Sequence, residues 1–349
     1  MKLRGVLVGG VLACLALTGC GDVGGASGDR PFTLPVGPTR WDATAPAWLL
    51  DGTLHVGERT VELGDDVDQF ALGATGVYWM RGRTLMFTSA EGETQRVEDV
   101  GWGNLAVSAD RSVFATVDQS RGPTDRYGTH VLQAAAFDTR TGEQLYRTPD
   151  EEPDGSDDLA DLYSETMPLL QGVSTERLFF GSSTIDLGDG SIRPMTKDSE
   201  DNDVFEGYPE TRFADGYRVG IRGEGRTRRV AGSAVYGVGV LSPDRTTLFD
   251  TGRWPTDAVA YDATTGRQRP IDAPWEHFTL VGWVDDDTFF GVAEDIDARD
   301  DVNPLQASQV VRCEVRTLGC TPVSPVIPTR ELVADESPYF LVESDQGQL

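Results

Sequence analysis

A seven-residue signature that occurs twice constrains the fold of this chain more than any other feature. Ala136–Gly142 reads AFDTRTG, and Ala260–Gly266 reads AYDATTG. The two copies start at residues 136 and 260, so they are 124 residues apart, which is three times about 41. A repeat of roughly 40–45 residues is typical of four-stranded units that stack side by side. The chain is therefore expected to consist of such units.

A second recurring pattern supports a structure made of strands. Leu105–Arg111 and Leu241–Arg245 both run from apolar residues into a polar turn, and an apolar or aromatic run follows each. Similar turns, some of them weaker, lie within Val284–Phe290, Ser174–Phe180, Thr75–Trp79 and Asp215–Tyr217. A polar turn between two such runs is typical of a β-hairpin. Since no long helical periodicity follows the N-terminal segment, the pattern predicts an all-β protein.

These segments resemble the strand–Ser-Pro-Asp-Gly–strand and Asp-x-x-Thr-Gly signatures of TolB-type, YVTN-type and WD-repeat β-propellers. The resemblance covers most of residues 46–349 and implies one β-propeller domain over this range. Arg111, Arg177 and Arg245 stand where the first signature has its final glycine. The resemblance implies an architecture and no particular activity, because unrelated functions share this fold.

The strand runs predict seven four-stranded blades, with six or eight blades as alternatives. Near the C-terminus, Glu331–Ser337 and Pro338–Val342 have the pattern of two inner strands. Near the start of the domain, Thr53–Val56 and Arg59–Leu63 flank a Gly-Glu turn and supply two outer strands. Pairing of these N-terminal and C-terminal strands would close the ring and remove its open sheet edges. The weakest signal is that of the fifth blade, around residues 203–231.

The first twenty residues have the features of a bacterial lipoprotein signal. A basic start precedes the apolar run Gly5–Leu17, which is too short to span a bilayer as a helix. Leu17–Cys20 reads LTGC and resembles a lipobox, which implies that residues 1–19 are removed and that Cys20 is lipidated. An ordinary signal peptide with a chance cysteine is the alternative. The resemblance predicts a protein anchored by lipid on the extracytoplasmic face of the cell membrane.

The segment between the predicted anchor and the domain is expected to be a tether. Residues 20–45 are rich in Gly, Pro, Thr and Ala and show no apolar periodicity. Such a composition is typical of a flexible linker, which would hold the domain clear of the bilayer.

The charge of the chain limits its partners. There are 57 Asp and Glu against 30 Lys and Arg, a formal net charge of −27. This balance opposes both nucleic acid binding and attraction to anionic lipid. With three His in the chain, a His-rich metal centre is not expected. We expect no cofactor, with calcium as the alternative.

Two cysteines remain in the predicted domain, Cys313 and Cys320. When Gly319 is aligned with the glycines of the repeated signature, these cysteines fall opposite each other on two strands of one hairpin. An exported protein favours a disulfide over a metal site. The sequence therefore predicts a structural Cys313–Cys320 bridge.

The longest and most charged segments are predicted to emerge on one face of the propeller. They are the within-blade loops 118–128, 251–257 and 294–306 and the inter-blade links 150–161 and 198–210. Neither the 198–210 link nor the 294–306 loop has the residue order of a calcium loop. Loops on a rigid scaffold commonly carry binding residues, and Arg, Tyr and Trp contribute most to interfaces. The predicted partner-binding residues are Arg121, Arg126, Tyr127, Arg253, Trp254, Asp297, Asp300 and Asp301.

The sequence favours binding over catalysis. His55, His130 and His277 lack a nearby Gly-x-Ser-x-Gly motif, and the repeats depart from the signatures of sialidase and quinone-dependent propellers. We expect a monomeric, non-catalytic protein-binding or scaffold module whose partner is an envelope protein or a surface glycan. The alternative is a carbohydrate-binding or glycoside-cleaving propeller that uses loop aromatics and carboxylates.

Overall fold

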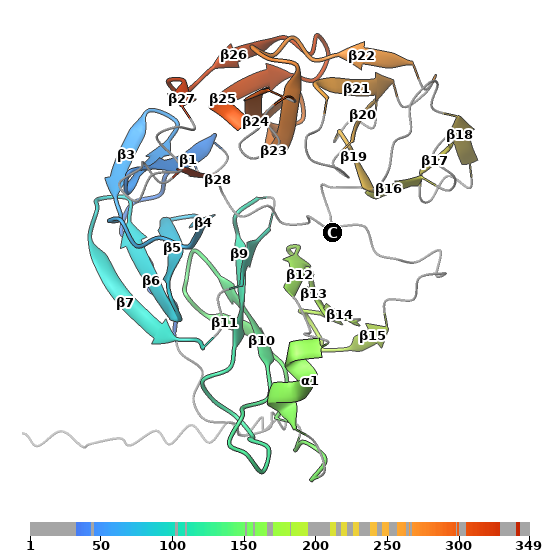
Figure 1. Ribbon diagram of the computed structural model, residues 1–349. Helices are drawn as coiled ribbons and strands as arrows, with labels where there is room; N and C mark the ends of the chain where they lie inside the picture. Colours follow the sequence, from blue (N-terminus) through green and yellow to red (C-terminus); the bar gives the residue numbers. More distant parts are fainter. Residues whose placement is uncertain are drawn as a thin grey trace, which may run out of the picture.

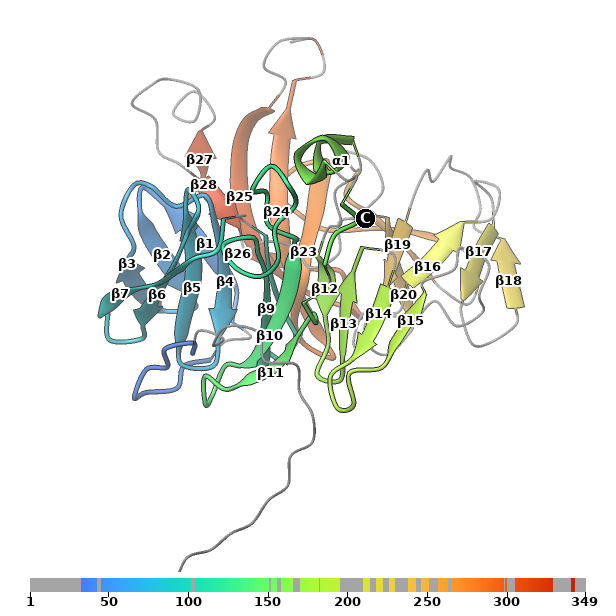
Figure 2. The ribbon, with the colours of Figure 1, turned by 90° about the horizontal axis from the view of Figure 1, so that it is seen from below.

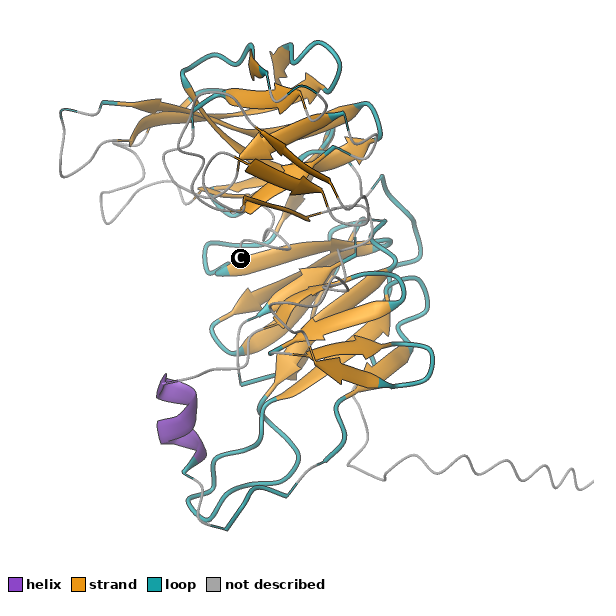
Figure 3. Cartoon of the chain, turned by 90° about the vertical axis from the view of Figure 1, so that its right-hand side faces the viewer, coloured by secondary structure: helices purple, strands orange, loops and turns teal. Residues whose placement is uncertain are grey.

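The structure is a computed structural model, and it is almost entirely β-strand with one short helix (Figure 3). It describes residues 33–42, 45–101, 104–108, 110–150, 152–155, 158–165, 170–181, 183–194, 210–213, 218–221, 226–229, 238–242, 246–250, 257–262, 265, 267–297, 299, 305–328 and 340–342. No helix among these residues is long and apolar enough to cross a membrane.

The strands form antiparallel sheets, which we number I to VI in chain order. Sheet I contains β28 (Phe340–Val342), β1 (Ala47–Leu50), β2 (Thr53–Val56) and β3 (Arg59–Glu62). Sheet II contains β4 (Gln69–Gly73), β5 (Gly76–Arg81), β6 (Thr84–Ser89) and β7 (Thr94–Asp99). Sheet III contains β8 (Leu105–Val107), β9 (Val113–Asp118), β10 (Gln133–Asp138) and β11 (Gln144–Arg147). Sheet IV contains β12 (Leu170–Val173), β13 (Arg177–Phe180), β14 (Ser183–Asp186) and β15 (Ile192–Pro194).

The two remaining sheets hold the C-terminal half of the chain. Sheet V contains β16 (Glu210–Phe213), β17 (Arg218–Ile221), β18 (Arg226–Arg229), β19 (Val238–Leu241), β20 (Thr247–Asp250), β21 (Val259–Asp262) and β22 (Gln268–Pro270). Sheet VI contains β23 (His277–Asp285), β24 (Thr288–Ile296), β25 (Leu305–Glu314), β26 (Cys320–Pro322) and β27 (Ile327–Pro328). Figure 1 shows the six sheets following one another around a common centre.

The repeated sequence signatures form repeated turns. The Oγ atoms of Ser108, Ser174 and Ser242 each accept a backbone N–H just past the turn, at 2.9, 3.0 and 3.0 Å. In the second signature, Asp138 Oδ1 accepts the backbone N–H of Thr141 at 3.0 Å, and Asp262 Oδ1 accepts that of Thr265 at 2.6 Å. A short polar side chain can therefore close these hairpins locally, which explains why the residue types recur.

Arg111, at the final position of the first repeated turn, adopts a backbone conformation that favours glycine. Its φ angle is 60°, in the left-handed region that favours glycine. The carbonyl of Arg111 accepts a hydrogen bond from Thr139 Oγ1 at 2.5 Å. This contact with Thr139 ties the turn to the neighbouring strand connection of the same sheet.

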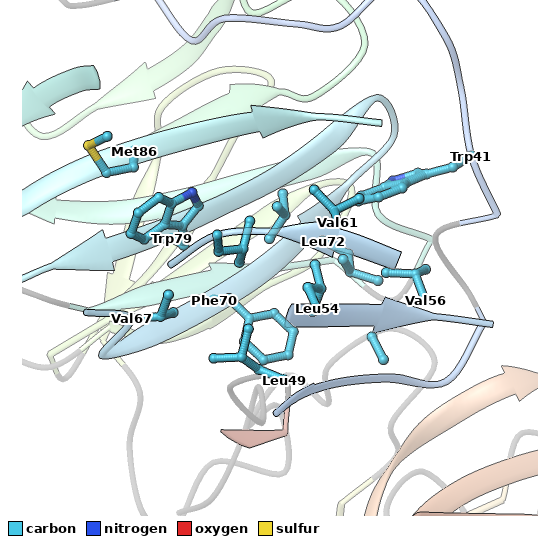
Figure 4. Packing of buried hydrophobic residues seen from close by; sticks show 13 residues of the cluster. Trp41, Leu49, Leu54, Val56, Val61, Val67, Phe70, Leu72, Trp79 and Met86 are labelled. Carbon is cyan, nitrogen blue, oxygen red and sulfur yellow. The ribbon is translucent and has the colours of Figure 1, made fainter. Parts of the chain in front are cut away.

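Neighbouring sheets pack through apolar clusters that each draw residues from two sheets. Figure 4 shows the cluster between sheets I and II, in which Leu49 and Leu54 of sheet I lie beside Phe70 of sheet II. Equivalent clusters join sheets II and III, III and IV, V and VI, and VI and I. Alternate residues of a strand face opposite sides of its sheet, so the apolar positions of one sheet can serve two neighbours. Separate four-stranded antiparallel sheets that pack in this way support a β-propeller.

Sheet I joins the two ends of the domain. β28 pairs with β1, with Trp48 opposite Val342 and Leu50 opposite Phe340. The strands that pair differ in detail from the prediction. Among the described residues, the N-terminal region supplies three strands of sheet I, and the C-terminal region supplies β28. Ala47–Leu50 was not predicted as a strand, whereas Thr53–Val56 and Arg59–Glu62 are strands as expected. The other predicted C-terminal strand, at residues 331–337, lies outside the described residues.

The fifth predicted blade differs most from expectation. Among the described residues, β16, β17 and β18 do not form a separate four-stranded sheet, because β16 pairs with β19 and gives the seven-stranded sheet V. The sequence of β18, Arg-Thr-Arg-Arg, lacks apolar residues with which to pack against a neighbouring sheet. The number of seven blades therefore remains a prediction.

The all-β expectation also missed helix α1 (Leu159–Glu165), which begins within the last residues of the acidic link 150–161. Asp158 caps its start: Asp158 Oδ1 accepts the N–H of Asp161 at 3.2 Å, and its carbonyl accepts that of Leu162 at 3.0 Å. Leu159 is buried against the domain. A helix of seven residues is too short to show a clear periodic pattern in the sequence.

Part of the predicted tether is packed against the domain. Leu34 is buried between sheets II and III, and its N–H donates to the carbonyl of Gly142 at 3.2 Å. Trp41 is buried between sheets I and II, and its Nε1 donates to the carbonyl of Gly73 at 2.7 Å. The burial of these two apolar side chains stabilises the contact of the segment with the domain.

The predicted disulfide between Cys313 and Cys320 is present. The two residues are opposite each other on β25 and β26, with their Cα atoms 4.1 Å apart. Because the cysteines are separated by seven positions, the closed loop is short, and the chain-entropy estimate of the stabilisation is about 2.5 kcal/mol. The bridge fixes a hairpin of sheet VI.

The stability of sheet I is expected to depend on pH through His55. Its ring stacks on Trp48 with a centroid distance of 3.7 Å, and burial lowers the pKa of His55 below its ordinary 6.5, although Glu62 opposes this shift. The unfolded chain therefore binds a proton more readily, so stability is lost as the pH falls below 6.5. We expect a steeper loss of thermal stability between about pH 7.5 and about pH 5.5 for the natural chain than for His55→Phe, which keeps an aromatic ring. Equal slopes would contradict this prediction.

Candidate functional site

The longer connections gather on one side of the sheets. In Figure 2, helix α1, the β9–β10 connection and the β24–β25 ends lie on the same side, which we call the loop face. The tight turns β10–β11 and β14–β15 lie on the opposite side. The arrangement of these described segments follows the sequence-based expectation that long connections share a face.

A cavity of about 670 Å³ opens between sheets V and VI at the loop face. Its walls come from the start of β21, the end of β22, the link that follows, and the loop-face ends of β23 and β24. The described lining residues are Asp257, Ala258, Val259, Pro270, Ile271, Ala273, Pro274, Trp275, Glu276, His277, Glu294, Asp295 and Ile296. Eight of these thirteen are apolar, four are carboxylic acids, and none is Lys or Arg.

A row of three titratable side chains crosses the cavity wall. The backbones of Asp257 and His277 pair in an isolated antiparallel β-bridge. His277 also lies directly opposite Glu294 in the pairing of β23 with β24. Directly opposite residues of antiparallel strands project to the same face, so the imidazole is placed between the two carboxylates. His277 Nδ1 is 3.7 Å from Asp257 Oδ1, beyond hydrogen-bond distance. That nitrogen is buried and has no hydrogen-bond partner among the described residues.

The carboxylates of the cavity differ in exposure. Glu294 is only 8% exposed and accepts a hydrogen bond from Thr279 Oγ1 at 3.3 Å. Asp257 and Glu276 are exposed at the rim, where the backbone N–H of Ala258 donates to the carbonyl of Glu276 at 2.7 Å. Trp275 is partly buried and packs against the apolar cluster of sheets V and VI. The cavity thus combines an apolar, aromatic wall with negative charge.

The β9–β10 loop carries three of the predicted partner-binding residues. Arg121 forms an ion pair with Glu98, and the Arg126 guanidinium lies 4.6 Å from the centroid of the Tyr127 ring. Tyr127 is 59% exposed. Arg126 and Tyr127 therefore form one exposed pair, whereas Arg121 is held against sheet II.

Helix α1 holds this loop in place. Asp125 Oδ1 accepts the backbone N–H groups of Tyr127 and Thr129 at 2.9 and 2.8 Å, and its Oδ2 accepts that of Leu159 at 2.8 Å. The Tyr163 hydroxyl accepts the N–H of Leu132 at 3.0 Å, and burial raises the pKa of this tyrosine. These contacts fix the position of the exposed Tyr127.

The remaining predicted residues are not brought together within the described residues. Asp297 forms a local ion pair with Arg299 at 3.0 Å, and the hydrogen bond from Arg299 lowers the pKa of Asp297. Arg253, Trp254, Asp300 and Asp301 lie outside the described residues. In the part of the chain that the structure describes, no group of three or more His, Cys, Asp or Glu side chains could hold a metal ion. The expectation of no cofactor, with calcium as the alternative, stays a prediction.

The cavity itself was not predicted. The sequence placed the loops 251–257 and 294–306 on one face, but the residues that it selected there lie within the loops rather than at strand ends. The last residue of the first loop, Asp257, and the first residue of the second loop, Glu294, line the cavity with His277. The sequence signal that could have indicated the cavity is a charged residue at each point where a strand meets a long loop.

Comparison with known proteins gives similarity of fold only. No protein-family model matches the sequence, and no curated protein matches it. A TolB-type structure from Agrobacterium tumefaciens is 10% identical, with 81% of this chain and 90% of that chain covered and a TM-score of 0.38. TolB from Acinetobacter baumannii is 14% identical, with 70% and 61% covered and a TM-score of 0.33. The Pyrococcus horikoshii acylaminoacyl peptidase is 10% identical, with 78% and 47% covered and a TM-score of 0.36.

These similarities do not decide what the chain does, because a shared fold does not imply a shared function. The class of this protein follows from its own sheets. It is an all-β protein of packed antiparallel sheets with an acidic cavity on its loop face.

Proposed function

We propose that this chain is a lipid-anchored, extracytoplasmic β-propeller that binds a protein partner at the cell envelope through its loop face. In this proposal Cys20 carries the lipid, seven blades close through sheet I, and the domain acts as a non-catalytic monomer. The observation that carries the proposal is the cavity between sheets V and VI, where two connections meet the ends of strands β21 to β24. The exposed Arg126–Tyr127 pair adds a second element of the kind that contributes to interfaces.

Site-specific photocrosslinking tests this function in bacteria that produce the full chain. A photoreactive phenylalanine analogue replaces Tyr127 on the loop face or, as the matched control, the exposed Asp189 in the β14–β15 turn. We expect a discrete crosslinked protein with the first variant and none with the second. The same product from both positions, or none from either, would contradict binding through the loop face.

The lipid anchor needs a separate readout in the same cells. Replacement of Cys20 with serine is expected to release the chain from the membrane fraction, because the domain's net negative charge gives no attraction to anionic lipid. Retention of Cys20→Ser in the membrane fraction would contradict anchoring by lipid.

A further inference from the structure

We propose that the cavity between sheets V and VI receives a basic side chain, arginine or lysine, from the protein partner. This inference rests on the proposed function and names the chemistry that the loop face recognises. It follows from three features of the cavity: its charge, its apolar wall and an unused buried nitrogen.

The charge of the cavity selects a cation. The described lining includes the carboxylic acids Asp257, Glu276, Glu294 and Asp295, and no Lys or Arg is among the described lining residues. An anion would be repelled by these groups, and a bare metal ion lacks a suitable group of three ligands among the described residues. A volume of about 670 Å³ lies within the range of roughly 300–1,000 Å³ that is common for ligand sites.

The apolar wall selects a cation with an aliphatic stem. Pro270, Ile271, Pro274 and Trp275 line the same cavity as the carboxylates. Arginine and lysine can bury their methylene groups against such a wall while the charged end meets the acids. The Trp275 ring offers an additional favourable contact to a cation.

The row of Asp257, His277 and Glu294 suits a donor with several N–H groups. His277 Nδ1 is buried without a hydrogen-bond partner among the described residues, and the Asp257 carboxylate lies 3.7 Å away. A guanidinium has five N–H donors and no acceptor, so it can donate to the Asp257 carboxylate and to a second acceptor of the row together. A neutral sugar hydroxyl would gain none of the charge attraction, so the cavity favours a basic side chain.

Binding of short peptides to the detergent-solubilised full chain tests this assignment. The probes are acetyl-Gly-Arg-Gly-amide, its lysine counterpart and its citrulline counterpart, which has nearly the shape of arginine but no charge. Calorimetry is expected to show binding of both basic peptides, with at least tenfold weaker binding of the citrulline peptide, about 1.4 kcal/mol. Equal binding of the arginine and citrulline peptides, or no binding of any peptide, would overturn the proposal.

Charge-neutral variants locate the binding. Asp257→Asn combined with Glu276→Gln removes two exposed rim charges and is expected to weaken binding of the arginine peptide at least tenfold. Glu58→Gln combined with Glu143→Gln removes two exposed charges from sheets I and III and is expected to leave binding unchanged. Equal effects of the two pairs would place the attraction in the net charge of the chain and overturn the cavity assignment.

Two further outcomes separate this proposal from related ones. Free L-argininamide carries the same side chain and is expected to bind about as tightly as the arginine peptide; at least tenfold weaker binding would show that the peptide backbone is recognised and that the side-chain assignment is wrong. If Tyr127 still gives a crosslinked partner while Asp257→Asn/Glu276→Gln binds the peptide like the natural chain, the cavity assignment fails and partner binding stands. The two proposals can therefore fail independently.

Discussion

Replacement of Arg147 with alanine is expected to lower the free energy of unfolding by about 3–5 kcal/mol. Arg147 Nη1 donates to Asp118 Oδ2 at 2.9 Å, and its Nη2 donates to Gln133 Oε1 at 2.6 Å. Asp118 is 0% exposed, so the variant would leave a buried carboxylate without its counter-charge. Ser120 would still donate to the other oxygen of Asp118, from its N–H at 2.8 Å and its hydroxyl at 2.6 Å, and these bonds cannot replace the lost charge. Urea denaturation measures the difference.

A matched control uses an ion pair of the same sheet. Arg140 forms an ion pair with Asp138 at 3.0 Å, but its side chain is 48% exposed. Arg140→Ala is expected to cost less than about 1 kcal/mol, because solvent screens an exposed pair. Similar losses of unfolding free energy for Arg147→Ala and Arg140→Ala would contradict the prediction that burial makes the Asp118–Arg147 pair the more stabilising of the two.

Removal of residues 340–349 is expected to lower the free energy of unfolding by about 3 kcal/mol, because β1 loses its neighbour β28. Backbone hydrogen bonds contribute about 0.5–1.5 kcal/mol each, and three residue pairs link these strands. Trp48 of β1 also packs on Phe290 and Val310 of sheet VI, so loosening of β1 weakens the contact between the two ends of the domain. Thermal and urea unfolding of the shortened chain measure the loss.

A chain that ends at residue 343 is the control, since it keeps β28 while it loses most of the same tail. We expect its stability to match that of the full chain. If both shortened chains are equally stable, pairing of β28 with β1 does not hold the domain together, and the proposed closure through sheet I is wrong.

Features that depend on nearby residues could be predicted from the sequence. The turns at Ser108 and Asp138 are closed by hydrogen bonds to residues at most five positions away. The Cys313–Cys320 bridge spans seven positions and follows from the hairpin alignment. Helix α1 is equally local, but its seven residues carry too little periodicity to be distinguished from a polar link.

Features that join distant segments needed the structure. The buried partners Asp118 and Arg147 are 29 positions apart, and each alone resembles one of the many exposed charges of the chain. The union of β16 with β19 in sheet V depends on which strand edges meet, and strand patterns do not specify this.

The sequence by itself determined the all-β class, the recurring hairpins and the disulfide, because short-range hydrogen bonding and the strand period select the residue types that form them. Only the tertiary structure decided that Asp257, His277 and Glu294 share one cavity wall. They belong to three strands or strand ends of two sheets, and the packing of sheet V against sheet VI brings them together. The physical reason is that charge and exposure in a folded chain depend on neighbours that the linear pattern does not contain.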